Sequence, residues 1–193
     1  MRRVLYLSHP EVVIDPVVPV PRWGLSAVGR ARLGAALARG WPGSGWQIVS
    51  SPEAKARETA ALIAAATGDP VLIHPDMGEV DRSSTGYLPH DRHEALADAL
   101  FANPLQGPES WESAGAAQAR IVNVYQNLLA GSQSNLLLVG HGAVGTFLWC
   151  HLAGRAIARC HDQPQGGCFW TWRIGEAAAP PPPWQRLEQA LPV

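Results

Sequence analysis

Two apolar runs, about 130 residues apart in the sequence, each lead to a histidine. Residues 4–7 (Val-Leu-Tyr-Leu) precede Ser8 and His9, and residues 136–139 (Leu-Leu-Leu-Val) precede a glycine and His141. Short apolar runs bounded by turn residues are typical of strands that are covered on both faces of a sheet. Because ligands bind beyond the carboxyl ends of the strands in an open α/β sheet, two histidines at such ends can face one substrate.

The rest of the sequence alternates between strand and helix patterns. Strands are expected over residues 3–8, 47–50, 71–74, 136–140 and 168–174. Helices are expected over residues 27–38 with Ser26 as N-cap, 53–65 with Gly68 as terminator, 91–101, 111–130 and 142–152. This alternation predicts an α/β protein, a three-layer α/β/α sandwich with a mainly parallel sheet.

Length and charge suggest a single domain that acts on a small partner. A chain of 193 residues can bury a sizeable core, and we expect one domain over residues 1–193. Residues 177–193 are expected to form a proline-rich C-terminal arm, because four consecutive prolines cannot continue a strand. The formal charge is −1 and no basic block stands out, so a nucleic-acid partner is not expected.

Cysteine usage and hydropathy indicate a cellular location. Three cysteines without paired spacing are interpreted as free thiols, which fits a reducing compartment. Only four apolar residues follow the basic start, too few for a signal-peptide core, and no run of 18 apolar residues occurs. We therefore expect a cytoplasmic protein without a membrane partner.

A third predicted strand end lies between the two histidines. Residues 50–60 (Ser-Ser-Pro-Glu-Ala-Lys-Ala-Arg-Glu-Thr-Ala) lead from a strand into a helix that carries cations. His9, this segment and His141, in that order, resemble the histidine phosphatase superfamily, also called phosphoglycerate mutase-like. The resemblance spans about residues 3–150. It implies a phosphoglycerate mutase-like fold and chemistry at a phosphate group.

The resemblance implies distinct roles for the two histidines. His9 would be the nucleophile, since a neutral imidazole can attack phosphorus without prior removal of a proton, and a phosphohistidine would result. His141 would donate to a phosphoryl oxygen. Gly142 opens the helix after it, where free N–H groups and the helix dipole favour phosphate.

The resemblance also supplies an acid and an entrance segment. Glu79, on the loop after the third expected strand, would protonate the leaving alkoxide, with Asp81 as the substitute candidate. A carboxyl group beside a phosphate has its pKa raised by like charge, which favours the protonated acid. The segment 111–113 (Trp-Glu-Ser) and the later Arg120 resemble family residues that organise the site entrance.

Two departures from the family pattern concern phosphate binding. The family has Arg-His-Gly where this chain has Ser8, His9 and a proline, and it has an arginine where this chain has Lys55. Lysine keeps the charge but lacks the planar fork that binds two oxygens. We include Ser8 and Lys55 among the expected phosphate-binding residues, and we hypothesise that Arg22 replaces part of the missing arginine.

The sequence thus predicts a phosphomonoester hydrolase that uses a phosphohistidine intermediate on a small phosphorylated molecule. No metal or cofactor is expected, because cations and helix N–H groups take the role that Mg²⁺ plays elsewhere. The first alternative is a catalytically weakened member that binds an anionic ligand or a partner without turnover. A metal-dependent hydrolase using both histidines is a further alternative, although they lack helical ligand spacing.

Overall fold

The computed structural model describes residues 2–175 and 180–191. Within these residues, strands form one mixed, mostly parallel sheet in the order β3-β2-β4-β1-β5-β6. Their bounds are Arg3–Ser8 (β1), Trp46–Ser50 (β2), Val71–Ile73 (β3), Asn135–Gly140 (β4), Cys168–Arg173 (β5) and Gln185–Arg186 (β6). The first four strands are parallel to their neighbours in this group, whereas β5 and β6 pair antiparallel.

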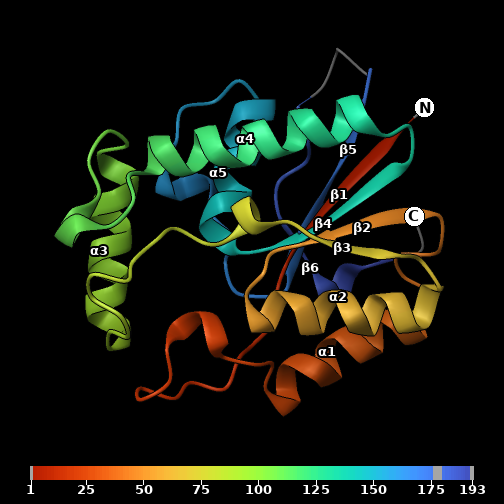
Figure 1. Ribbon diagram of the computed structural model, residues 1–193, viewed down its shortest axis with the longest axis horizontal. Helices are drawn as coiled ribbons and strands as arrows, with labels where there is room; N and C mark the ends of the chain where they lie inside the picture. Colours follow the sequence, from red (N-terminus) through yellow and green to blue (C-terminus); the bar gives the residue numbers. More distant parts are fainter. Residues whose placement is uncertain (1, 176–179, 192–193) are drawn as a thin grey trace.

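Helices cover both faces of the sheet, as Figure 1 shows. On one face lie α1 (Ala27–Ala38) and α2 (Ala54–Thr67), and on the other lie α4 (Ala114–Gly131) and α5 (Gly142–Leu152). A further helix, α3 (His90–Ala102), stands apart from these two layers. The predicted three-layer sandwich is confirmed.

The alternation of side chains along β1 builds the two layers of core. Leu5 and Leu7 point to the face covered by α1 and α2, whereas Val4 and Tyr6 point to the face covered by α4 and α5. All four side chains are fully buried. Burial on both sides explains why this strand is a continuous apolar run in the sequence.

Local capping sets the helix bounds. Ser26 Oγ accepts from Gly29 N at 3.1 Å, and Gly68 closes α2 in the left-handed conformation with φ 77°, both as predicted. The helix predicted from residue 111 begins at Ala114, because Ser113 Oγ accepts from the Ala116 N–H and so acts as the N-cap. The third strand ends one residue earlier than predicted.

A third core holds the segment after β3 close to α3. Val80 from that segment packs with Phe101 of α3, Trp111 and Phe147 of α5. Phe101 and Phe147 are in ring contact, with centroids 5.2 Å apart. This packing fixes the loop that carries Glu79.

The end of the chain returns to the sheet. Trp184 packs against Tyr6 and Trp170, and the carbonyls of Pro181 and Pro182 accept from Trp149 Nε1. Parts of the predicted proline-rich arm, residues 177–179 and 192–193, lie outside the described residues. Among the described helices, none has the length and apolar character needed to cross a bilayer.

Candidate active site

Sheet register brings the ends of three strands together. Ser8 at the end of β1 pairs with Gly140 at the end of β4, and Ser50 of β2 pairs with Val139 of β4. Beyond these ends, His9 N donates to the Gly140 carbonyl at 2.9 Å. The rings of His9 and His141 lie 5.2 Å apart between centroids, with an interplanar angle of 71°. The two predicted histidines therefore face each other at one edge of the sheet.

The His9 ring is held in one tautomer. Its Nδ1 lies 2.8 Å from the carbonyl oxygen of Pro10, and because a carbonyl only accepts, Nδ1 carries the proton. Burial, followed by the charge of Lys55, lowers the pKa of His9 to about 4. At neutral pH the ring is uncharged and Nε2 carries a lone pair.

His141 is fixed through its backbone and its ring. The Tyr6 hydroxyl accepts from His141 N and donates to His141 O, both at 3.1 Å. Gly140 leaves room for this hydroxyl, since a Cβ there would collide with it. On the ring, Nε2 lies 2.7 Å from Ser51 Oγ and 3.4 Å from Glu53 Oε1. Nδ1 is buried and has no hydrogen-bond partner within the described part of the chain. Burial lowers the pKa of His141 well below its ordinary value.

Glu53, which the sequence analysis did not identify, joins the start of α2 to the site. Its carboxylate pairs with Lys55 Nζ and accepts from Glu79 N at 2.9 Å. Burial raises the pKa of Glu53, but the contacts with His141 and Lys55 outweigh burial and lower the pKa to about 2. Glu53 is therefore a carboxylate across the working pH range.

Lys55 is buried and already has partners. Besides Glu53, its Nζ contacts the carbonyl oxygen of Val20 at 3.0 Å. Its charge lies close enough to His9 to lower the pKa of that ring. Lys55, which was predicted to bind phosphate, therefore lies beside the site, and two of its three N–H groups are engaged by Val20 and Glu53.

Glu79 lies at the N-terminus of α5. Its Oε1 accepts from Val80 N at 3.0 Å and Val144 N at 3.2 Å, and its Oε2 accepts from Ala143 N at 3.3 Å. Burial raises the pKa of this carboxyl above its ordinary value. A buried carboxyl with a raised pKa suits a proton donor.

The loop that carries Glu79 is clamped by Arg120 of α4. The guanidinium binds both carboxylate oxygens of Glu112, at 3.0 and 2.7 Å. It also donates to the carbonyls of Asp76, Gly78 and Glu79. The segment 111–113 and Arg120, which the resemblance linked to the site entrance, are therefore in contact with the loop of the predicted acid.

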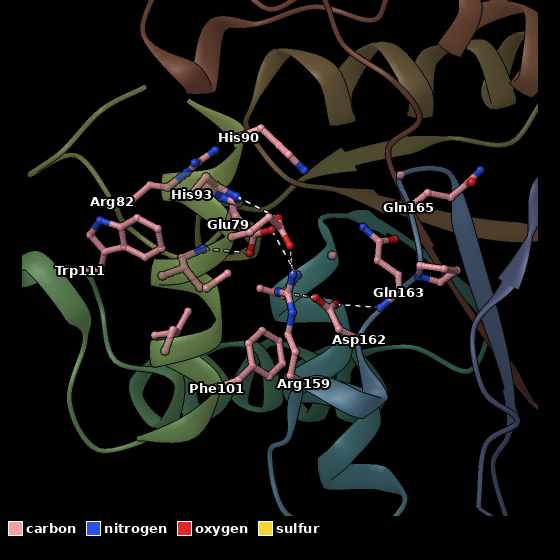
Figure 2. A pocket seen from close by; sticks show the side chains of 18 of the residues that line it. Glu79, Arg82, His90, His93, Phe101, Trp111, Arg159, Asp162, Gln163 and Gln165 are labelled. Atoms are coloured by element: carbon pink, nitrogen blue, oxygen red, sulfur yellow. Dashed lines mark hydrogen bonds and ion pairs between the residues drawn. The ribbon is translucent and has the colours of Figure 1, made fainter. Parts of the chain in front are cut away.

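A cavity of about 490 Å³ opens beside His9, Glu79 and Gly142. Figure 2 shows Arg82, His90 and His93 along one side of it, with Gln163 and Gln165 on the other side. A second cavity, of about 590 Å³, lies between the loop 16–21 and the segment 79–87, and Glu79, Val80 and Arg82 line both cavities. These volumes are in the range of small-molecule sites.

Arg82 is a cation that the sequence analysis missed. Its side chain is half-buried between the two cavities, and burial lowers its pKa while Glu79 and Glu53 oppose that shift. Among the described residues, no hydrogen bond or ion pair engages its guanidinium. In contrast, Arg159 at the same cavity pairs with Glu94, Asp98 and Asp162.

The remaining predicted residues differ in their distance from the cavity. Gly142 lines it, and Ser8 is fully buried behind it with its hydroxyl on Gln163 and β5. Arg22, in the short 3₁₀ turn Val20–Arg22, is exposed and lines neither of the two cavities. Within residues 2–175 and 180–191, no cluster of three or more His, Cys, Asp or Glu side chains could hold a metal ion.

The fold and the facing histidines define a phosphoglycerate mutase-like protein. The sequence pattern of the histidine phosphatase superfamily, branch 1, matches residues 21–174, so the chain belongs to this family. The match begins after His9 and leaves out Ser8, His9 and Pro10. No curated protein matches the sequence significantly.

Solved structures share this fold at low sequence identity. A mycobacterial glucosyl-3-phosphoglycerate phosphatase has a TM-score of 0.73 and 22% identity, over 88% of this chain and 89% of its own. YhfR of Bacillus stearothermophilus has a TM-score of 0.75 and 17% identity, over 96% and 95%. The phosphoserine phosphatase of Entamoeba histolytica, solved with 3-phosphoglyceric acid, has a TM-score of 0.74 and 15% identity, over 95% of each chain.

Proposed function

We propose that this protein is a phosphomonoester hydrolase that forms a phosphohistidine at His9 on a small phosphorylated substrate. The observation that carries the proposal is the state of the His9 ring. Because the Pro10 carbonyl accepts a hydrogen bond from Nδ1–H and burial keeps the ring neutral, the lone pair of Nε2 is available for attack. Membership of a family of phosphatases and mutases supports this chemistry.

In the first step, His9 Nε2 attacks phosphorus and the bond from phosphorus to the ester oxygen breaks. The leaving oxygen takes a proton from Glu79, whose pKa is raised by burial, which favours the protonated acid. The products of this step are the free alcohol, a phosphohistidine and an ionised Glu79.

In the second step, water attacks the phosphohistidine and the bond between nitrogen and phosphorus breaks. Glu79, now a carboxylate, takes the proton from the attacking water. Inorganic phosphate leaves, and His9 and Glu79 return to their starting states. The same carboxyl group therefore acts first as an acid and then as a base.

Phosphoryl oxygens would be bound by donors that have few other partners. We assign Arg82 as the guanidinium, since it lines the cavity and has no ion pair with any residue that the structure describes. His141 can take up a proton at Nδ1 when an anion enters, and Nδ1–H then donates a hydrogen bond to a phosphoryl oxygen. Gly142 contributes the N-terminus of α5, and Lys55 contributes charge while it holds Glu53.

Ser8 supports the alternative of a catalytically weakened member that binds an anion without turnover. No arginine precedes the nucleophile, and the hydroxyl of Ser8 faces away toward β5. The variant His9→Ala distinguishes the two alternatives. It abolishes phosphate release if the protein is a hydrolase, whereas a protein that binds an anion without turnover releases no phosphate in either form.

A panel of phosphomonoesters with alkyl, sugar and aryl leaving groups tests the proposal through phosphate release at neutral pH. We expect turnover of at least one class, reduced to background in His9→Ala and strongly reduced in Arg82→Ala. If wild-type protein hydrolyses none of them and still binds inorganic phosphate, the weakened-member reading holds instead. Arg22→Ala, measured alongside, tests the hypothesis that Arg22 binds phosphate, and unchanged phosphate affinity would remove it from the site.

A further inference from the structure

Ser8, the residue before the proposed nucleophile, contacts the loop that leads into β5. Ser8 Oγ accepts from Cys168 N at 3.1 Å and lies 3.1 Å from Cys168 O. The same hydroxyl contacts Oε1 of Gln163. The hydroxyl has one proton and two acceptors in reach, Cys168 O and Gln163 Oε1. Gln163 Oε1 is the nearer of the two, so we assign the proton to Gln163.

This contact sets the orientation of the Gln163 amide. With Oε1 on Ser8, the Nε2 group lies on the other side, against the start of α5, where a Cβ on Gly142 would collide with it. Figure 2 shows the amide nitrogen directed toward the cavity that His9 and Gly142 also line. Among the described residues, no acceptor is bound to Gln163 Nε2 or to Gly142 N.

The backbone of Gln163 is held independently of its side chain. Gln163 N donates to Asp162 Oδ1 at 2.8 Å. The same carboxylate oxygen accepts from Thr146 Oγ1 of α5 at 2.9 Å, and Oδ2 pairs with Arg159 at 2.9 Å. The Gln163 residue is thus held at its backbone N–H and at its amide oxygen before any ligand binds, which lowers the entropy that binding costs.

We propose that Gln163 donates from Nε2 to a phosphoryl oxygen of the substrate and that Ser8 is its positioning residue. This inference rests on the proposed function for the identity of the anion. The pair takes the place of the arginine that the family carries before its nucleophile. A neutral amide replaces one hydrogen bond of a guanidinium but none of its charge, and the charge comes from Arg82.

The test measures the dissociation constant of inorganic phosphate and the kcat and KM of the best substrate in four variants. Gln163→Leu removes the donor, Gln163→Glu replaces it with a carboxylate, Ser8→Ala releases the amide, and Ser8→Ala combined with Gln163→Leu closes a cycle. Gln126→Glu, on the exposed side of α4, is the control for net charge.

Gln163→Leu is expected to weaken phosphate binding about tenfold or more, the size of one hydrogen bond to a charged group. Gln163→Glu should weaken it further, and Ser8→Ala less than Gln163→Leu. Once Gln163 is leucine, Ser8→Ala should add little further loss, because its effect runs through the amide. Thermal unfolding of every variant identifies any that fails to fold, in which case the remaining Gln163 variant carries the comparison.

Wild-type phosphate affinity and kcat/KM in both Gln163 variants would overturn the inference while leaving a hydrolase at His9 intact. Additive losses in the double variant would overturn the positioning role of Ser8. If the protein hydrolyses nothing yet its phosphate affinity depends on Gln163 as stated, the inference holds and the proposed function fails. Absence of any phosphate binding by wild-type protein would overturn both.

Discussion

At the end of β1, a residue that departs from the family pattern takes part in the site through its backbone. Pro10 has no N–H to offer a phosphate, but its carbonyl oxygen fixes the proton of His9 on Nδ1. Burial and the charge of Lys55 outweigh this hydrogen bond and lower the pKa of His9 to about 4, so the proposed nucleophile is neutral. A departure in residue type at this position is therefore compatible with the chemistry of the histidine.

The residue scale also yields a prediction for Glu79. Because burial raises its pKa, the protonated acid persists to higher pH than for an ordinary carboxyl and is lost as pH rises through that value. We expect kcat/KM for an alkyl phosphate to fall on the alkaline side. Glu79→Gln should lower it by about 10² to 10⁴ and remove that alkaline limb.

A leaving group that needs no proton provides the control for this variant. With 4-nitrophenyl phosphate, whose product is a stable anion, Glu79→Gln should lose much less. Steady-state kinetics from pH 5 to 9 with both substrates make the comparison. Equal losses on the two substrates would contradict the role of Glu79 as an acid.

Sequence reasoning identified the residues with a local signature and missed those defined by tertiary position. His9 and His141 follow apolar strands, so their positions could be predicted. Arg82 and Gln163 lie on loops whose place depends on packing by α3 and on Asp162. No local pattern marks them, although an arginine three residues after the predicted acid was a usable hint.

At the scale of elements, the first turn of α2 acts as a connected unit. Ser51 and Glu53 contact the ring of His141, and Glu53 also binds Lys55 and the backbone of Glu79. The sequence predicted a helix here, with Lys55 as a phosphate-binding residue. It could not show that the cation pairs with the glutamate two residues earlier, because that depends on Glu53 sitting at the N-cap with an extended backbone.

This unit predicts a stability difference between two cations on one helix. The side chains of Lys55 and Glu53 are 5% and 11% exposed, so Lys55→Met leaves a buried carboxylate without its partner and should cost about 3 kcal/mol at pH 7. Arg57→Met, on the exposed face of α2, should change the free energy of unfolding by less than about 0.5 kcal/mol. Urea unfolding measures both.

The stabilisation by the ion pair of Lys55 and Glu53 should depend on pH. The folded pKa of Glu53 is about 2, below the unfolded value, so its contribution is present above the unfolded pKa and lost as pH falls toward 2. In Lys55→Met the Glu53 carboxyl takes up a proton more readily. The difference in the free energy of unfolding between this variant and the wild type should therefore become smaller below about pH 4. A loss in Lys55→Met no larger than in Arg57→Met would show that the ion pair does not stabilise the fold.

Secondary structure was predictable because each element carries its own signals. The apolar runs gave β1 and β4, and Ser26 and Gly68 gave the ends of α1 and α2. The start of α4 was misplaced by three residues, since Trp111 belongs to the core against Phe147 rather than to the helix. The periodicity of apolar residues does not show whether an aromatic residue belongs to a helix or packs in the core just before it.

At the scale of the whole molecule, the sheet and two separate loops enclose one site. The parallel register of β1, β2 and β4 places three strand ends in a row. The segment 79–93 closes one side of the cavity and the loop 159–166 closes the other (Figure 2). The order of motifs in the sequence predicted the row of strand ends, whereas the walls of the cavity depend on tertiary packing that no local pattern encodes.

The most direct measurement is to trap phosphate on the protein. Wild-type protein is mixed with a labelled phosphomonoester, quenched in alkali within the first turnover and digested, and the labelled peptide is sequenced. Our account predicts acid-labile, alkali-stable phosphate on His9 and none in His9→Ala. Hydrolysis without any phosphate on His9, or phosphate on another residue, would contradict it.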